Sequence, residues 1–288
     1  MEMDLIDKIE KGLSKMTKSQ QIVADYIIKN PIEAAFSTIS KIANDTGVST
    51  ATVIRFTTCL GFSGFADFQQ CMQQRMVHKA SPLDKIELSA TKRKDHSDFS
   101  KMVQEITSRS MTSLNNTFES LSSEVVERAV KDILGAEHIY ICGGRSSHSV
   151  AHYLAYNLDR LFCNTDFWQS DTTMILEKLR RVSEKDLVIV ISFPRYTKAT
   201  VDIGRICKEQ GAKVVAITDS HNSPFAQYTD YHIIAHRGMG SFQNSVMSAI
   251  YIADVLLNLC SKSAYEKGRG NLEKSEELTT KLSLFVNK

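Results

Sequence analysis

No stretch of this 288-residue chain is apolar for long enough to cross a lipid bilayer, which takes about 20 consecutive apolar residues. The opening residues, MEMDLIDKIEKGL, show a charged amphipathic pattern and lack the continuous apolar centre of a signal peptide. We therefore expect a cytoplasmic protein that has no membrane partner.

Paired cysteines are also missing. The six cysteines stand far apart, and none belongs to a C-x-x-C pair. Most of them lie among apolar residues, which is typical of buried thiols in a reducing compartment and not of disulfides or zinc ligands. The sequence therefore predicts no disulfide framework and no metal site, and no cofactor is expected.

A large excess of positive charge is likewise absent. The formal net charge is +2, from 35 Lys and Arg against 33 Asp and Glu. A protein that binds polyanions in general is far more basic than this. If the chain binds DNA, its positive charge must be placed locally, and a second copy of the chain must contribute a second half-site.

What the sequence does contain is a helix-turn-helix pattern in residues 37–68, STISKIANDTGVSTATVIRFTTCLGFSGFADF. Ala43 is small where a second helix would cross the first, and Gly47 suits the turn because glycine tolerates a positive φ. Ser49 is then placed to cap the second helix by accepting hydrogen bonds from its first amides. On that helix the spacing predicts a buried face made of Val53, Phe56 and Leu60.

The residues that remain for the outer face of this second helix are Thr50, Ala51, Thr52, Ile54 and Arg55. Ser49, Thr50, Thr52 and Arg55 lie at its start, where a recognition helix contacts base edges in the major groove. We take these four as candidate DNA-binding residues. The alternative is an ordinary helical hairpin, since a small residue followed by glycine also occurs by chance, but several agreeing spacings favour DNA binding.

The apolar pattern divides the chain into two domains of different class. Residues 1–76 are helical throughout and predict an all-α helix-turn-helix domain, whereas residues 77–97 lack a sustained period and predict a linker. Residues 98–288 begin with two helices and then alternate short apolar strands with helices. Such strands are typical of a parallel sheet covered on both faces, so we predict a three-layer, flavodoxin-like α/β sandwich with five parallel strands.

The strands of this second domain are expected at 138–142, 164–168, 186–192, 212–218 and 230–236. Helices are expected at 148–162, 170–180, 197–210, 224–227, 243–262 and 271–285.

Polar residues follow three of the predicted strands. In an open parallel sheet, ligands bind beyond the carboxyl ends of the strands. The loop GGRSSHS (143–149) offers Ser146 and Ser147 next to the amides of a helix start, and SFPRYTKAT (192–200) offers Ser192, Arg195 and Thr197. These five residues are the candidate ligand-binding residues for a small anion, with TDSHNSP (218–224) as a third polar loop.

The alternative for each loop is a plain strand-to-helix cap, because Ser, Thr and Asp cap helices in many proteins. The first loop also lacks the G-x-G-x-x-G fingerprint, so a nicotinamide cofactor is a poor match.

Three segments carry a resemblance to a known family: VSTATVIRF followed by LGFSGFADF, the Gly- and Ser-containing turn after the first strand, and IVISFPRYTKAT followed by GAKVVAITDSHNSPFA. With them, nearly the whole chain resembles the RpiR/MurR-type bacterial transcription regulators. The resemblance implies an N-terminal helix-turn-helix domain and a C-terminal sugar isomerase (SIS) domain. It also implies a homodimer or homotetramer on a double-stranded DNA operator of carbohydrate metabolism genes, with a phosphosugar or related metabolite as effector.

The family's phosphate-binding serines correspond to Ser147 and Ser192. The second loop departs from the family pattern S-x-S-G-x-T, because Pro194 replaces a serine and Arg195 replaces the glycine, while Thr197 keeps the threonine. One hydroxyl is lost and one guanidinium is gained. An anionic effector is still expected, and a sugar acid suits an arginine as well as a sugar phosphate does.

An isomerase of the same fold is the alternative to a regulator. Isomerisation needs an acid–base pair near the sugar's first two carbons, and His148, His152, His221 and His236 lie near predicted strand ends. The sequence shows no Asp or Glu paired with any of them. We therefore expect a regulator that is not an enzyme.

Overall fold

The computed structural model describes residues 5–79, 82, 83, 86, 98–169, 175–237 and 243–285. The chain divides into two compact units at Asp98–Phe99. The helix that closes the first unit continues through residue 79, three residues into the predicted linker 77–97, and most of that linker lies outside the described residues. The domain limits that we gave from the sequence stay a prediction.

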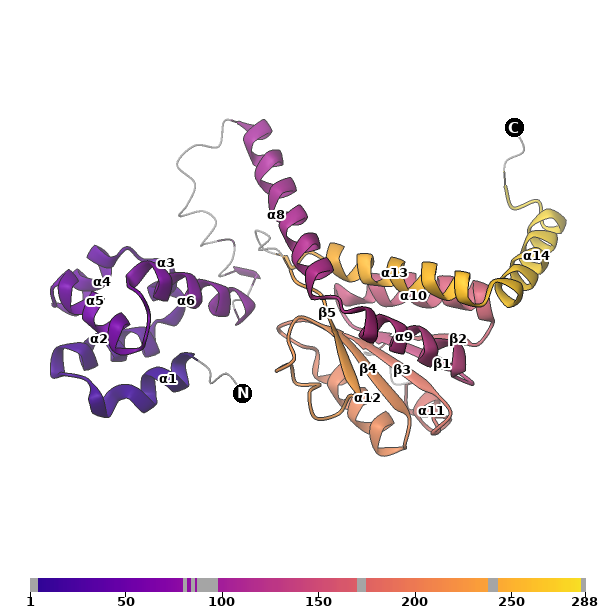
Figure 1. Ribbon diagram of the computed structural model, residues 1–288, viewed down its shortest axis with the longest axis horizontal. Coiled ribbons are helices and arrows are strands. Elements are labelled where there is room, and N and C mark those ends of the chain that lie inside the picture. Colours follow the sequence, from indigo (N-terminus) through magenta and orange to yellow (C-terminus); the bar gives the residue numbers. More distant parts are fainter. Residues whose placement is uncertain are drawn as a thin grey trace. The chain divides into compact units, whose positions relative to one another are not determined.

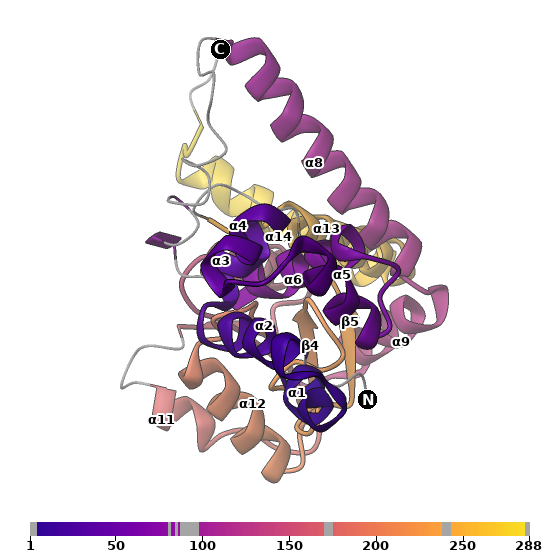
Figure 2. The same cartoon turned by 90° about the vertical axis from the view of Figure 1, so that its left-hand side faces the viewer.

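The first unit is built from helices alone in its described part (Figures 1 and 2). These are α1 (Leu5–Gly12), the short 3-10 helix η1 (Leu13–Lys15), α2 (Lys18–Lys29), α3 (Pro31–Phe36), α4 (Ile39–Thr46), α5 (Thr50–Cys59) and α6 (Phe65–Lys79). Local signals set their ends: a capping box with Gln20 begins α2 at Thr17, and Pro31 stands in the first turn of α3.

The core of this unit gathers one apolar stripe from each helix. Phe68 is almost fully buried, and its ring meets the rings of Phe56 and Phe62 edge to face at 5.7 and 5.4 Å between centroids. The aromatic residues that follow α5 therefore pack against the bundle. Ile22 of α2, by contrast, is 49% exposed.

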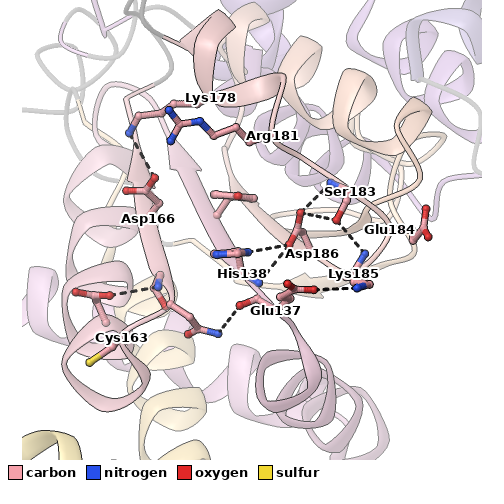
Figure 3. Close-up of a pocket in the computed structure, with 14 residues that line it drawn as sticks. Glu137, His138, Cys163, Asp166, Lys178, Arg181, Ser183, Glu184, Lys185 and Asp186 are labelled. Atoms are coloured by element: carbon pink, nitrogen blue, oxygen red, sulfur yellow. Dashed lines mark hydrogen bonds and ion pairs between the residues drawn. The ribbon is translucent and has the colours of Figure 1, made fainter.

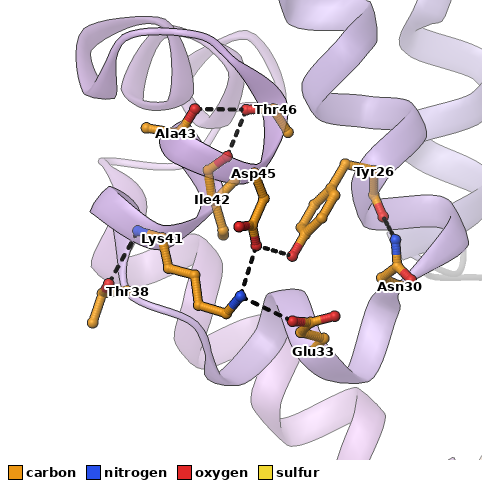
Figure 4. Close-up of polar contacts among 9 residues, drawn as sticks. All are labelled: Tyr26, Asn30, Glu33, Thr38, Lys41, Ile42, Ala43, Asp45 and Thr46. Atoms are coloured by element: carbon orange, nitrogen blue, oxygen red, sulfur yellow. Dashed lines mark hydrogen bonds and ion pairs between the residues drawn. The ribbon is translucent and has the colours of Figure 1, made fainter.

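A polar network outside the core fixes α4 against α2 and α3 (Figure 4). The carboxylate of Asp45 accepts hydrogen bonds from the Tyr26 hydroxyl and the Lys41 ammonium, both at 2.8 Å, and Lys41 also pairs with Glu33 at 3.1 Å. The hydrogen bond from Lys41 holds the pKa of Asp45 below its ordinary value, and partial burial with Asp45 nearby raises the pKa of Tyr26 to about 12. This network ties the first helix of the helix-turn-helix pair to two neighbouring helices.

The second unit alternates strands with helices. Its helices are α8 (Phe99–Ser120), α9 (Ser123–Gly135), α10 (Ser147–Phe162), α11 (Ile175–Leu179), α12 (Lys198–Glu209), α13 (Met247–Ser263) and α14 (Tyr265–Lys281). Its strands are β1 (Ile139–Gly143), β2 (Thr165–Trp168), β3 (Leu187–Ile191), β4 (Lys213–Thr218) and β5 (Tyr231–Ile234). The strands form one parallel sheet in the order β2-β1-β3-β4-β5, which confirms the predicted fold class.

Helices cover both faces of this sheet (Figure 1). Alternate residues of the strands point to opposite faces, so Ile139 and Ile141 of β1 pack under α9, α10 and α13, whereas Tyr140 and Cys142 pack with α11 and α12. All five residues of β1 and of β3 are buried. Burial on both faces explains why these strands read as continuous apolar runs.

Two predicted helices of this unit are corrected by the structure, and a third is tested only in part. Residues 224–227 form turns and not a helix, with Ala226 donating from its amide to the carbonyl of Ser223. The last helix begins at Tyr265 and not at 271, because only a kink at Ala264 separates it from α13. Of the predicted helix 170–180, residues 175–179 are α11, and 170–174 lie outside the described residues.

Candidate functional site

The turn before α5 places the start of this helix. Gly47 adopts φ +67°, and the amide of Val48 donates to the carbonyl of Ala43 at 3.0 Å, which ends α4 and reverses the chain. The Ser49 hydroxyl accepts a hydrogen bond from the amide of Thr52 at 3.2 Å and also contacts the Thr52 hydroxyl at 3.0 Å. Ser49 is therefore the cap that the sequence predicts.

The buried and outer faces of α5 are clearly separated. Val53 and Phe56 have no exposed surface and Leu60 is 5% exposed, so the predicted buried face is confirmed. Thr50 and Arg55 are exposed on the outer side, and Thr52 is partly buried beside its hydrogen bond to Ser49. The four candidate DNA-binding residues extend from the cap, Ser49, to Arg55 in the middle of α5, and their role in binding DNA stays a prediction.

Strand register brings the polar loops of the second unit to one edge of the sheet. Gly143, the last residue of β1, is paired with Ile191, and Ile191 is paired with Ile217. A Cβ atom on Gly143 would lie 2.8 Å from the carbonyl oxygen of Ser147, so α10 begins directly against the end of β1. Only glycine permits this approach.

The five candidate ligand-binding residues differ in burial at this edge. Ser147 and Ser192 are each 4% exposed, whereas Ser146 and Arg195 are exposed and Thr197 is partly buried. Arg195 has φ +59°, a left-handed conformation that is uncommon outside glycine, at the position where the family has glycine. Thr197 precedes α12 without a side-chain capping bond, which removes the plain-cap interpretation for that residue.

Three further residues at the same edge form a polar cluster that the sequence analysis missed. The Tyr196 hydroxyl donates to the carboxylate of Asp219 at 2.7 Å, and the Arg237 guanidinium lies 3.6 Å from the other oxygen of Asp219. The guanidinium also lies over the ring of Phe193, 5.1 Å from its centroid. The side chain of Arg237 is 4% exposed and that of Asp219 is 9% exposed.

Burial sets the electrostatics of this cluster. Desolvation raises the pKa of the Tyr196 phenol, and the charge of Asp219 raises it further. Desolvation lowers the pKa of Arg237, while Asp219 acts against that change. A buried cation and a buried anion thus hold each other at the edge where the predicted ligand site lies.

Part of this cluster was visible in the sequence and part was not. Tyr196 and Asp219 stand inside two of the loops already singled out as polar, so their position after β3 and β4 was a usable signal. Arg237 follows β5, the edge strand, and no pattern in the sequence marks its side chain as buried against Phe193.

A pocket of about 570 Å³ lies at the opposite, amino edge of the sheet (Figure 3). Its wall includes Asp186, whose carboxylate accepts hydrogen bonds from the amides of Ser183 and His138 at 2.8 and 3.2 Å. Asp186 therefore fixes the loop before β3 against the start of β1. Because ligands of open parallel sheets bind at the carboxyl edge, we assign this carboxylate a structural role and not a binding role.

The four histidines considered for catalysis make other contacts. His148 and His152 stack at 6.2 Å between ring centroids and both meet the ring of Phe167 edge to face. His221 packs against His232, and the amide of His236 donates to the Thr117 hydroxyl at 2.9 Å. Among the ion pairs of the described residues, the histidine that faces a carboxylate is His138, at the amino edge.

Within the described ranges, no cluster of three or more His, Cys, Asp or Glu residues is arranged to hold a metal ion. No helix in the described part of the chain combines the length and apolar character that a bilayer span requires.

Two family models match this chain. The model for the helix-turn-helix domain of the rpiR family matches residues 3–79, and the model for the SIS domain matches residues 132–259. An uncharacterized HTH-type transcriptional regulator of Clostridium perfringens is 24% identical over 272 residues, which cover 92% of this chain and 95% of that protein. The HTH-type transcriptional regulator HexR of Escherichia coli is 27% identical over 227 residues, which cover 78% and 75%.

Two solved structures are similar as well. The NanR protein of Vibrio vulnificus, complexed with ManNAc-6P, is 25% identical with a TM-score of 0.61, covering 99% of this chain and 100% of that one. The sugar isomerase domain of an RpiR transcription factor from Sphaerobacter thermophilus is 25% identical with a TM-score of 0.60, covering 62% of this chain and 99% of that one.

Proposed function

This chain belongs to the rpiR family of DNA-binding, helix-turn-helix transcriptional regulators that carry a SIS domain, and from this premise we propose that it senses a small anionic sugar derivative at the carboxyl edge of its sheet. The observation that carries the proposal is the pair of buried hydroxyls, Ser147 and Ser192, at the ends of two neighbouring strands. Hydroxyls can donate to the oxygens of a phosphate or a carboxylate, and Ser147 also lies at the start of a helix, α10.

The charge at this edge supports an anion. Ser147 is the first residue of α10, where the helix dipole favours negative charge, and Arg195 adds an exposed, permanent positive charge in the neighbouring loop. The solved structure of the similar NanR protein is a complex with ManNAc-6P, which supports a phosphosugar as the effector of this chain. The guanidinium of Arg195 suits a sugar acid equally, so the proposed effector class is a phosphosugar or a sugar acid that controls genes of carbohydrate metabolism.

DNA contact is proposed for the outer face of α5, through Ser49, Thr50, Thr52 and Arg55. The exposure of Thr50 and Arg55 at the start of a capped helix supports this role. A helix-turn-helix protein gains affinity by placing two copies on two half-sites, so we propose a homodimer or homotetramer. Large apolar side chains of α8 are exposed and available for such an assembly, namely Phe99, Val103, Ile106, Met111 and Phe118.

We also propose that the SIS domain binds its effector without converting it. The contacts of His148, His152 and His221 are with other rings, which supports a role in packing and not in proton transfer. Effector binding would then act by favouring one arrangement of the assembled chains over another, which requires different affinity for the two arrangements. Such a regulator would work in the cytoplasm, where bacterial DNA lies.

A reciprocal pair of variants tests this function. The full chain is titrated with ManNAc-6-phosphate, other hexose phosphates, sugar acids and the matching neutral sugars, and unfolding is followed by the fluorescence of Trp168, the single tryptophan. An effector at 100 times its Kd should stabilise the fold by about 2.7 kcal/mol, a shift of several degrees in Tm. Ser192→Ala combined with Arg195→Gly should lose this shift and keep DNA binding.

Arg55→Ala is the matched control, expected to keep the effector response and to weaken DNA binding by roughly tenfold or more. A Tm shift given by neutral sugars alone, or one that persists in the double variant, would contradict the proposed site. Conversion of a sugar phosphate during incubation, detected by NMR, would instead support the isomerase alternative.

A further inference from the structure

The outer face of α5 carries more than the four predicted DNA-binding residues. Since the buried face is formed by Val53, Phe56 and Leu60, the helical period of 3.6 residues directs Ala51, Ile54, Arg55 and Thr58 away from the core. All four of these residues are exposed. Ile54, at 45% exposure, is the large apolar residue at the centre of this face.

Thr58 can add an apolar group to this face. The Thr58 hydroxyl donates to the carbonyl of Ile54 at 3.0 Å, one turn earlier in the same helix. This bond uses the donor of the hydroxyl within α5, so the groups left for a partner are the γ-methyl and an acceptor oxygen. Ala51, Ile54 and Thr58, three and four residues apart, therefore form one continuous apolar ridge beside Arg55.

The chemistry of the major groove identifies what such a ridge can recognise. The base edges in the groove present hydrogen-bond donors and acceptors, and thymine alone adds an apolar group, its 5-methyl. Arg55 is a cation suited to guanine or to a phosphate, whereas the ridge has no free hydrogen-bond donor. We propose that the apolar ridge Ala51–Ile54–Thr58 reads thymine methyl groups in each operator half-site, with Ile54 as the principal contact.

This inference rests on the proposed DNA-binding role of α5 and adds the base that the helix selects. A single exposed isoleucine is by itself ordinary on a protein surface. Ile22 on α2 is such a residue, 49% exposed and outside α5. It provides a control that matches Ile54 in residue type, exposure and domain.

The experiment begins with selection of bound sequences from a random DNA library by the full-length chain. Each thymine of the enriched half-site is then replaced by deoxyuridine, which keeps every hydrogen-bonding group and lacks the 5-methyl. The affinity of the wild-type chain should fall roughly three- to fivefold when deoxyuridine stands at one or two of these positions. This factor corresponds to the loss of about one buried methyl group at each position. Ile54→Ala should bind the thymine operator more weakly by a similar factor and show no further loss with deoxyuridine at those positions.

Ile22→Ala should behave as wild type on both operators. Unchanged wild-type affinity at every deoxyuridine position would overturn the inference, and so would an Ile54→Ala variant that keeps the full deoxyuridine effect. Failure of the library to yield any enriched sequence would instead reject the DNA-binding role itself, so the two failures are distinguishable.

Discussion

In the first unit, the candidate DNA-binding residues lie within residues 49–55 of a single helix start, whereas in the second unit the candidate ligand-binding residues come from loops that follow different strands. The first set is mostly exposed, with Thr50 and Arg55 directed to solvent. The second set includes the buried hydroxyls of Ser147 and Ser192 and adjoins the buried pair Asp219–Arg237.

This difference predicts how binding and stability are coupled in each unit. An exposed side chain on a helix contributes little to folding, so its replacement changes binding alone. A buried polar side chain depends on its partner, because removal of the partner leaves a desolvated group without compensation. Substitutions on the outer face of α5 should therefore change binding without changing stability. Substitutions of the buried polar residues at the sheet edge should change both.

The largest effect is expected for Arg237→Met in the second unit. The change leaves the carboxylate of Asp219 buried without its cation, which should cost roughly 3 kcal/mol or more in the free energy of unfolding. Urea unfolding followed by Trp168 fluorescence measures this unit, because the Trp168 side chain is fully buried within it. Arg269→Met, which removes an exposed pair with Glu273, should leave the unfolding midpoint close to that of wild type, because solvent screens such a pair. Equal urea midpoints for the two variants would contradict the expected difference between the buried and the exposed ion pair.

Gly143→Ala should have an intermediate effect at the same edge. The added methyl would lie 2.8 Å from the carbonyl oxygen of Ser147 and 3.0 Å from the Cβ of Ala151, so the start of α10 must move. We expect a loss of about 1–3 kcal/mol in the Trp168 unfolding experiment and a weaker effector response, since Ser147 moves with the helix. Gly135→Ala, which meets no atom within 4 Å, should be neutral or stabilising. If both alanine variants had wild-type stability, α10 would not be held by close contact with β1.

The smallest effect is expected in the first unit for Asp45→Asn, and it should depend on pH. The hydrogen bond from Lys41 lowers the pKa of Asp45 in the folded state, so this carboxylate stabilises the fold above its ordinary pKa of about 3.9. That contribution should disappear as the pH falls through the lowered folded value. Hydrogen exchange of α2 and α4 peptides should therefore differ between the variant and wild type at pH 7, and the difference should shrink progressively as the pH falls below about 3.9. The control is Asp25→Asn, at an exposed position of α2, which should not differ from wild type in a pH-dependent way. If the exchange of Asp45→Asn and of wild type differed by the same factor at every pH, the ionised Asp45 in the network of Figure 4 would not be the cause of the difference.

The sequence predicted best where the signal is local. Gly47, Ser49 and the spacing of Val53 and Phe56 specify a turn, a cap and a buried face through residues that are neighbours along the chain. Continuous apolar runs predicted all five strands within a few residues of their ends. Each of these features depends on backbone conformation and side-chain period over a few residues.

Burial could not be predicted where it depends on what packs against an element. Large apolar side chains of α8, such as Ile106 and Phe118, are exposed, and the buried positions of this helix are Ser113 and Thr117. Thr117 is buried because its hydroxyl accepts a hydrogen bond from the amide of His236, a residue far along the chain. No pattern within residues 99–120 contains that information.

By itself, the sequence determined the class of each domain, the recognition helix and the polar loops of the sheet, because helical and strand periods are properties of neighbouring residues. Only the tertiary structure decided which of those loops meet, because the register of β1, β3 and β4 aligns their ends and the fold then brings Arg237 to Asp219. Burial, which makes hydroxyls and charges strong partners, arises from that assembly and not from any one segment.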